Sequence, residues 1–268
     1  MSKVSVIMGI YNCETSLSKS IDSIFNQTYT DWEFIICDDG STDNSYFIAK
    51  EYEQRFPDKF RVIKNYNNLG LAASLNNCIK VAQGKYIARM DGDDISMPTR
   101  LEKQVEFLTE HPDYDMVGCS IYIFDDNKLW GERTLKEYPT KEDFLWTSPF
   151  CHASILYNSD SLRKAGLYHC EKITLRCEDY DLFMRMYALG MKGYNMQQPL
   201  YKVYEGQDAY QRRKYRYRID EMKVRYRGFK NLGLMPKGFL YVMKPLIVGL
   251  LPSSFLIKVR RTKKLEEQ

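Results

Sequence analysis

Residues 85–94 read Lys-Tyr-Ile-Ala-Arg-Met-Asp-Gly-Asp-Asp, a short apolar run typical of a buried strand that ends in a turn with three carboxylates. Residues 33–41 repeat this arrangement, because the apolar run Glu33–Cys37 leads into Asp38-Asp39-Gly40-Ser41. A helical pattern follows each acidic turn. Two such strand–turn–helix units predict a parallel sheet with an acidic edge where its strands end.

The alternation of strand and helix continues on both sides of these two units. The strand of the first unit covers Lys85–Met90, and further strands are predicted at Val4–Ile10, Arg61–Lys64 and Met116–Phe124. Apolar residues at helical spacing predict helices at Ser16–Phe25, Ser45–Arg55, Leu71–Ala82 and Thr99–Glu110. The predicted fold class is therefore α/β, a Rossmann-like and mostly parallel sheet flanked by helices, with ligands at the carboxyl ends of the strands.

The composition is that of a globular protein kept in a reducing compartment. The chain has 268 residues, 44% of them apolar and 28% charged, which excludes a disordered or fibrous polypeptide. Its seven cysteines form no metal-type Cys-x-x-Cys pair, so a disulfide framework is not expected. No long apolar segment opens the chain, and no stretch approaches the ~20 apolar residues that a spanning helix needs. These features predict a cytoplasmic protein.

Charge is distributed unevenly along the chain. The net charge is +4, but residues 209–268 hold sixteen Lys and Arg against four Asp and Glu, or +12, which leaves −8 for residues 1–208. An acidic body with a basic tail predicts an anionic surface as a partner. The acidic body counts against nucleic acid, so no nucleic-acid partner is expected.

The two acidic turns are expected at one edge of the sheet, where Asp38 and Asp39 would face Asp91, Asp93 and Asp94. Either cluster alone would be an ordinary polar turn. Together they repel one another unless a cation or ligand donors lie between them. Carboxylate oxygens without nitrogen or sulfur ligands favour Mg²⁺ or Mn²⁺, and phosphate oxygens usually complete such sites. The sequence therefore predicts a divalent metal and a phosphorylated ligand.

Other nucleotide and metal motifs are missing. A calcium loop beginning at Asp91 fails, because Ile95 and Ser96 occupy positions that need a ligand and a glycine, and Pro98 interrupts the loop. Neither a G-x-G-x-x-G stretch nor a Walker lysine loop is present, which argues against NAD(P) and kinase-type ATP.

A second group of acids lies in Cys177–Arg185 (CEDYDLFMR), where Glu178–Asp181 would form the first turn of a helix. Acids there favour the helix dipole, and this structural role stays open. The functional interpretation is a carboxylate held over the ligand site as a general base. His152 is open in the same way, as a core histidine or an acceptor contact.

Seven motifs resemble those of family 2 glycosyltransferases of the GT-A fold, the bacterial type that builds surface polysaccharides. They are Val4–Asn12, Gln27–Tyr29, Ile36–Asp43, Asn68–Leu71, Tyr86–Asp94, Pro98–Leu101 and Glu178–Leu182. The resemblance covers about residues 4–205. It is specific because all seven motifs occur in the family's order and spacing.

The resemblance implies a role for each polar motif. Tyr11 would stack on the nucleotide base and Asp39 would accept a hydrogen bond from it, which suits the N3–H of uracil or thymine and favours a UDP-sugar. Asp91 would contact the ribose or the metal shell, and Asp93 would ligate Mn²⁺ or Mg²⁺ on the diphosphate. Asp179 would deprotonate the acceptor hydroxyl.

The resemblance further places Ile10 and Asn68 in the nucleotide-sugar site, and His152 and Glu178 on the acceptor side. It implies a GT-A catalytic domain at residues 1–208, with a nucleotide-binding half (about 1–120) and an acceptor half (121–208), followed by a basic helical tail at 209–268. The implied acceptor is a glycan or lipid-linked saccharide in capsule, O-antigen or exopolysaccharide synthesis.

Two departures from the family pattern refine this expectation. Family members often carry a His after the base, where this chain has Tyr201–Glu205 (YKVYE). Processive synthases carry Gln-x-x-Arg-Trp, whereas Gln211–Tyr215 (QRRKY) lacks the Arg-Trp pair. The predicted enzyme is therefore non-processive, and the base that the resemblance implies opposite the leaving group predicts inversion at the anomeric carbon.

The tail has two interpretations. Phe239–Leu251 is mostly apolar with Lys244 and Pro245 inside it, and the basic run Arg260–Lys264 follows. Such a segment suits an anchor lying on the inner face of the cell membrane. It equally suits a helix packed on the catalytic domain.

Two other functions are compatible with part of the sequence. A phosphatase with an aspartyl nucleophile would use the Asp91-x-Asp93 pair, but Asp94-Ile95 follows where that family has Thr or Val, and Tyr11 would be unexplained. A nucleotide-sugar-binding protein without turnover is the remaining alternative.

Overall fold

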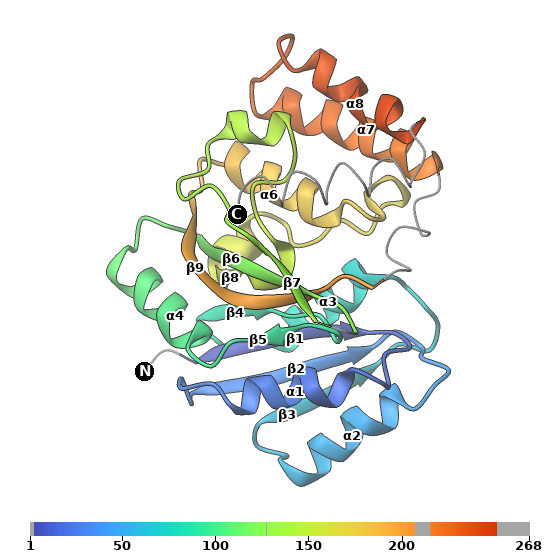
Figure 1. Cartoon of the computed structure of the whole chain (residues 1–268), viewed down its shortest axis with the longest axis vertical. Helices are drawn as coiled ribbons and strands as arrows, with labels where there is room; N and C mark the ends of the chain where they lie inside the picture. Colours follow the sequence, from blue (N-terminus) through green and yellow to red (C-terminus); the bar gives the residue numbers. More distant parts are fainter. Residues whose placement is uncertain (1–2, 127, 207–214, 251–268) are drawn as a thin grey trace.

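The computed structural model describes residues 3–126, 128–206 and 215–250. Residues 211–214 of the Gln211–Tyr215 motif and the basic run Arg260–Lys264 therefore lie outside the described residues. A single mixed sheet forms the centre of the molecule, with the strand order β3-β2-β1-β4-β8-β6-β9-β5 and with β7 paired to β6 (Figure 1). Its strands are β1 (Val4–Ile10), β2 (Trp32–Asp38), β3 (Phe60–Lys64), β4 (Tyr86–Arg89), β5 (Ile95–Ser96), β6 (Met116–Phe124), β7 (Leu129–Arg133), β8 (Leu156–Asn158) and β9 (Gly193–Tyr204).

The first four strands are parallel, as the sequence predicts. β1 pairs with β2 and with β4, and β2 pairs with β3, so the carboxyl ends of all four strands lie at one edge of the sheet. The remaining strands change direction. β8 is antiparallel to β4 and to β6, and β5 is antiparallel to β9, while β6 and β9 are parallel to each other. The sheet is therefore mixed, with its parallel part formed by the first four strands.

Helices cover both faces of the sheet. They are α1 (Leu17–Phe25), α2 (Ser45–Arg55), α3 (Leu71–Val81), α4 (Arg100–Glu110), α5 (Ser159–Lys164), α6 (Glu178–Ala188), α7 (Tyr215–Asn231) and α8 (Phe239–Gly249), with short 3-10 helices η1 (Lys141–Leu145), η2 (His152–Ser154) and η3 (Lys172–Thr174). The predicted helices and strands of the first half lie within two residues of these bounds.

Successive residues of β1 enter different cores, as the two-residue period of a strand requires. Val6 and Met8 belong to one buried cluster with Ile21 of α1 and Leu101 of α4. Ile7 belongs to the opposite cluster, which includes residues of α3 and α6. Both faces of the sheet are therefore buried, which explains the uninterrupted apolar strands in the sequence.

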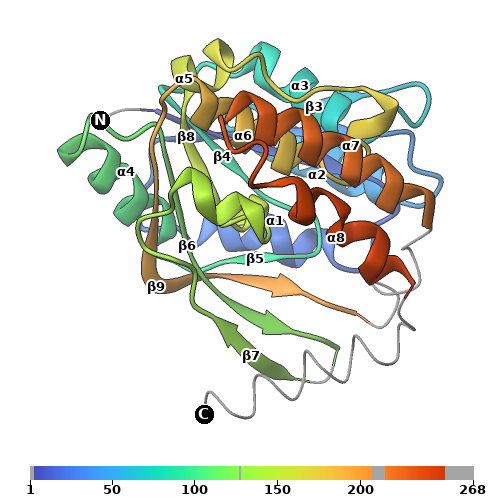
Figure 2. The ribbon, with the colours of Figure 1, turned by 90° about the horizontal axis from the view of Figure 1, so that it is seen from above.

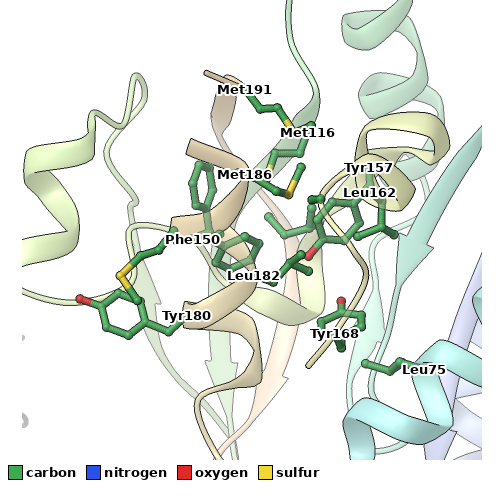
Figure 3. Close-up of a cluster of buried hydrophobic side chains, with 14 of the residues drawn as sticks. Leu75, Met116, Phe150, Tyr157, Leu162, Tyr168, Tyr180, Leu182, Met186 and Met191 are labelled. Atoms are coloured by element: carbon green, nitrogen blue, oxygen red, sulfur yellow. The ribbon is translucent and has the colours of Figure 1, made fainter. Parts of the chain in front are cut away.

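The second cluster fixes the position of α6. Leu182 and Met186 of this helix point toward Phe150, Met116 and the neighbouring side chains (Figure 3). Leu182 and Met186 are fully buried. Because this packing holds the helix rigidly, it also holds the acidic residues of its first turn.

The C-terminal helices pack on the rest of the chain. α7 lies over α6, and α8 lies beside α7 (Figure 2). Val224 and Phe229 of α7 are fully buried in the same cluster as Phe183 of α6. The described part of the predicted tail thus shares a core with residues before position 208. Across residues 3–126, 128–206 and 215–250, no helix combines the length and the apolar character needed to cross a membrane.

Candidate active site

One cavity of about 480 Å³ opens at the carboxyl ends of β1, β2 and β4. One wall consists of the end of β1, the loop at residues 68–71 and the acidic turn after β4. A second wall is formed by side chains from the segment 169–178, namely His169, Cys170, Glu171, Thr174, Leu175, Arg176 and Glu178, together with Tyr217 of α7. The lining contains seven of the nine residues predicted for the site, namely Ile10, Tyr11, Asn68, Asp39, Asp91, Asp93 and Glu178.

Tyr11 stands at the turn after β1 with half of its surface exposed (51%). The next residue, Asn12, has a positive φ of 50°, a conformation that asparagine tolerates better than most residues. Its side-chain oxygen accepts a hydrogen bond from the backbone N–H of Thr42 at 2.9 Å. The turn is therefore tied to the loop after β2, and the Tyr11 ring is left open to a ligand.

Asp39 is buried and fixes the loop at residues 68–71 by hydrogen bonds. One carboxylate oxygen accepts hydrogen bonds from Asn65 Nδ2 at 2.8 Å and from the Leu69 N–H at 2.9 Å. The other oxygen accepts from the Gly70 N–H at 2.8 Å. Asp39 thereby positions the Asn68–Leu71 motif, and its second oxygen keeps acceptor capacity toward the cavity.

Arg89, the last residue of β4, forms an ion pair with Asp91. Its guanidinium is nearly fully buried and contacts both Asp91 carboxylate oxygens at 2.5 Å. Paired in this bidentate way, the Asp91 carboxylate is fixed in orientation. Asp93, two residues further, is exposed in the cavity wall.

The segment Tyr201–Glu205, where family members often carry a His, supports this acidic turn from β9. The Tyr201 hydroxyl accepts a hydrogen bond from the Asp91 N–H at 3.2 Å, and the Tyr204 N–H donates to Asp94 Oδ1 at 2.8 Å. From the other side, the Ser16 hydroxyl donates to the Gly92 carbonyl at 2.9 Å. The turn is thus held by β9 on one side and by Ser16 on the other.

The acidic turn fits a divalent cation. Carboxylate oxygens of Asp91, Asp93 and Asp94 all lie within 4.8 Å of one another. Asp94 is buried, its Oδ2 has no hydrogen-bond partner, and burial raises its pKa well above the ordinary range. Oxygen donors alone suit Mg²⁺ or Mn²⁺. Asp93 is the exposed member of this cluster, and its side chain lines the cavity.

Glu178 and Asp179 are the first two residues of α6, at the second wall of the cavity. Burial and the neighbouring Asp179 raise the pKa of Glu178 to about 7. Burial also raises the pKa of Asp179, while the Tyr180 N–H and Arg89 oppose that rise. Glu178 lines the cavity, whereas Asp179 lies behind it, within the electrostatic reach of Arg89 and Asp91.

A cluster of charges fastens the second wall to α7. Asp181 is buried and accepts hydrogen bonds from Arg185 Nε at 2.8 Å and from Arg227 Nη2 at 2.7 Å, with His169 Nδ1 at 2.9 Å. Arg227 of α7 also contacts both oxygens of Glu171, at 2.8 and 3.0 Å. The loop at residues 169–176 is therefore held between α6 and α7.

His152 lies away from the cavity lining. Its Nε2 is 2.8 Å from the Tyr168 hydroxyl, and its ring contacts the Phe183 ring edge-on. Burial holds its pKa well below the ordinary value, so the ring is neutral. The structure places this side chain in the packing beneath the second wall.

The sequence did not point to Arg89, Arg176 or Tyr217 as residues of the site. Arg89 reads as one basic residue in a strand, and its partner Asp91 two positions later was the available signal. Arg176 and Tyr217 line the cavity from segments that no predicted unit brought near it.

The family description Glycosyl transferase family 2 matches residues 5–166. The chain belongs to this family of glycosyltransferases. It is 42% identical over 266 residues to the putative glycosyltransferase EpsE of Bacillus subtilis, covering 99% of this chain and 96% of that protein. It is 29% identical to the amylovoran biosynthesis glycosyltransferase AmsE of Erwinia amylovora, covering 92% and 94%. A third relative is the Escherichia coli protein WfgD, named UDP-Glc:alpha-D-GlcNAc-diphosphoundecaprenol beta-1,3-glucosyltransferase, which is 35% identical over 48% of this chain and 49% of WfgD.

Solved structures share the fold. Staphylococcus aureus TarS in complex with UDP-GlcNAc superposes with a TM-score of 0.70 at 18% identity, over 88% of this chain and 72% of TarS. The mannosyltransferase PcManGT of Pyrobaculum calidifontis, in complex with GDP-Man and Mn²⁺, gives a TM-score of 0.62 at 18% identity, over 98% and 81%. The GT-A fold predicted from the sequence is confirmed.

Proposed function

We propose that this glycosyltransferase moves one sugar from a nucleotide-diphosphate donor to an acceptor hydroxyl with inversion at the anomeric carbon. One observation carries the proposal. One cavity brings together an exposed aromatic ring, an acidic turn suited to a divalent ion, and the start of α6, where Glu178 lines the cavity and Asp179 is its neighbour. These groups can hold the nucleotide base, the diphosphate and the attacking hydroxyl.

In the proposed reaction, Asp179 takes the proton from the acceptor hydroxyl, whose oxygen then bonds to the anomeric carbon. The bond from that carbon to the donor diphosphate breaks on the opposite face, which inverts the configuration. Glu178 stands beside Asp179 on the cavity side and is the competing candidate for this proton transfer. A bound Mn²⁺ or Mg²⁺, met by Asp93, would stabilise the charge that develops on the diphosphate.

UDP is the nucleotide that the pocket favours. The proposed contact is from the N3–H of uracil to the Asp39 oxygen that accepts only the Gly70 N–H. Tyr11 would stack on the base, and Ile10 and Asn68 would line the nucleotide site. TarS was solved with a uridine nucleotide and PcManGT with a guanosine nucleotide, so fold alone does not select the base.

The proposed acceptor is a glycan or lipid-linked saccharide in bacterial polysaccharide synthesis. The names of two relatives support this assignment, since AmsE belongs to amylovoran biosynthesis and WfgD acts on a diphosphoundecaprenol-linked sugar. A single transfer per encounter is proposed because the processive Gln-x-x-Arg-Trp motif is missing at Gln211–Tyr215.

We also propose that the enzyme works at the cytoplasmic face of the membrane, with α8 on the lipid surface. This helix turns Val242 inward but exposes 79% of Leu240 and 63% of Ile247. Residues 215–250 hold eight Lys and Arg against two Asp and Glu. Exposed apolar side chains among basic groups suit an anionic lipid surface.

The donor assignment is tested by a screen of UDP-glucose, UDP-GlcNAc, dTDP-glucose and GDP-mannose, measuring affinity by calorimetry with Mn²⁺, with Mg²⁺ and with EDTA. The proposal expects tight binding of at least one UDP-sugar only when a metal is present. Equal affinity in EDTA would contradict the metal role, and preference for GDP-mannose would contradict the uracil contact.

A further inference from the structure

Arg176 stands in the cavity wall two residues before Glu178, and the proposed reaction gives it no role. Among the described residues that line the cavity, it is the sole arginine or lysine. Five carboxylates line the same cavity, those of Asp39, Asp91, Asp93, Glu171 and Glu178. A substrate with phosphate groups would add negative charge to an already negative cavity, so each positive group there matters.

The fold itself does not use the Arg176 guanidinium. In the chain as far as it is described, this side chain is exposed and makes no hydrogen bond or ion pair. The other arginines of the second wall are engaged, because Arg185 and Arg227 both donate to Asp181. Arg176 alone among them keeps its donors available to a ligand.

The backbone at Arg176 is held in an unusual conformation. Its φ is +74°, in the left-handed region where glycine or asparagine is the ordinary choice. Its backbone N–H lowers the pKa of Glu178, so the main chain at this position faces the start of α6. The loop that carries Arg176 is held by the contacts of Arg227 to Glu171. An arginine thus occupies a position where the backbone conformation favours glycine or asparagine.

We infer that Arg176 binds a phosphate group of a substrate in the cavity that Asp93 also lines. The inference rests on the proposed function. A guanidinium matches phosphate oxygens through two parallel N–H donors, which is the chemistry that an exposed and unengaged arginine offers. The phosphate has two candidate sources, the donor diphosphate and the diphosphate that links an acceptor sugar to lipid.

The test compares wild type, Arg176→Asn and the control Lys172→Asn by calorimetry with Mn²⁺. Asparagine suits the positive φ while removing the guanidinium, and Lys172 lies in the same loop but outside the cavity lining. The donor arm compares the affinity for UDP with the affinity for uridine, which lacks the diphosphate. The acceptor arm measures inorganic pyrophosphate on protein saturated with UDP and Mn²⁺, whose donor diphosphate site is already filled.

If the phosphate belongs to the donor, Arg176→Asn weakens the affinity for UDP by about 10- to 100-fold and leaves the affinity for uridine unchanged. If it is the acceptor's, UDP affinity is retained and pyrophosphate binding to the UDP-saturated protein is lost. Lys172→Asn should leave both affinities unchanged, and Arg176→Asn should unfold at the wild-type temperature or above.

The inference is overturned if Arg176→Asn alters neither affinity, or if Lys172→Asn causes the same loss. It is also overturned if wild-type protein saturated with UDP binds no pyrophosphate and the UDP affinity of Arg176→Asn is normal. A wild-type protein that binds no UDP, dTDP or GDP would instead contradict the proposed function.

Discussion

At the scale of single residues, the site consists of side chains whose partners explain their positions. Arg89 fixes Asp91, and Asp39 fixes the loop at residues 68–71. Tyr11 differs from these residues, because its side chain is half exposed in the cavity lining. The carboxylates of this site could be predicted from the sequence since they follow apolar strands directly. Arg89 is harder to predict, because a lone arginine in a strand does not by itself reveal which carboxylate it meets, even with Asp91 two positions later.

Replacing Tyr11 tests the stacking assignment. Tyr11→Ala should weaken UDP binding by roughly 1–3 kcal/mol, the usual contribution of a base stacked on an aromatic ring. Tyr11→Phe keeps the ring and should lose much less. Calorimetry on both variants checks this, and equal losses would show that the hydroxyl matters instead of the ring.

The raised pKa of Glu178 predicts a pH dependence of stability in metal-free protein. Its pKa is about 7 in the folded state against an ordinary 4.5, so the folded state binds the proton more tightly. The group therefore favours folding below about pH 4.5, and that contribution is lost as pH rises through 7. Glu178→Gln should melt at a higher temperature than wild type at pH 8, with a smaller difference at pH 5. Thermal melts in EDTA measure this, and a pH-independent difference would contradict it.

At the scale of elements, the sequence predicts those whose pattern is local. β1 to β4 are continuous apolar runs, and α1 and α4 have a clear apolar face. β5 has two residues and β8 has three, too few for any period to show. β9 mixes polar residues with Pro199, and its pairing with β6 is an effect of tertiary structure.

α7 is the element that the sequence describes least well. Its many charged residues suggested a tail, yet Val224 and Phe229 are fully buried and Arg227 clamps the wall of the site. Amphipathic patterning is weak here because charged residues also occupy much of the side facing the protein. One of them, Arg225, is buried and donates to the Leu145 carbonyl at 3.1 Å.

Truncating Phe229 tests whether α7 belongs to the catalytic core. Phe229→Ala should cost about 3–5 kcal/mol of unfolding free energy, as for other large buried aromatics. Phe239→Ala on α8 is the control, because this ring is 53% exposed and should change stability by under about 0.5 kcal/mol. Urea unfolding measures both. A similarly small loss for the two variants would mean that the C-terminal helices fold apart from the core.

At the scale of the whole molecule, charge and apolar surface are arranged asymmetrically. The cavity is acidic, whereas the two C-terminal helices carry the basic residues and the exposed Leu240 and Ile247. Trp146 is 63% exposed, and the Lys244 ammonium lies 3.4 Å from the centre of its ring. Burial lowers the pKa of Lys244 to about 8. This arrangement would turn one end of the molecule toward a lipid surface and leave the cavity to one side.

Membrane association can be tested on that surface. Leu240→Ser combined with Ile247→Ser should reduce flotation with phosphatidylglycerol vesicles several-fold without changing UDP affinity, since neither residue lines the cavity. Leu129→Ser, an equally simple change on exposed β7, is the control. High salt should weaken wild-type binding because the attraction is partly electrostatic. Undiminished flotation of the double variant would remove α8 from this role.

The central claim is that this cavity transfers a sugar by proton abstraction at the start of α6. Metal-dependent release of UDP from a UDP-sugar, followed in wild type, Asp179→Asn and Glu178→Gln, tests it most directly. Loss of a general base typically lowers the rate about 10²–10⁴-fold, so Asp179→Asn should lose turnover while UDP affinity stays close to wild type, and Glu178→Gln should lose less. Full turnover by Asp179→Asn together with collapse in Glu178→Gln would move the base to Glu178. Full turnover by both variants, or no UDP release by wild type with Mn²⁺ or Mg²⁺, would contradict the account.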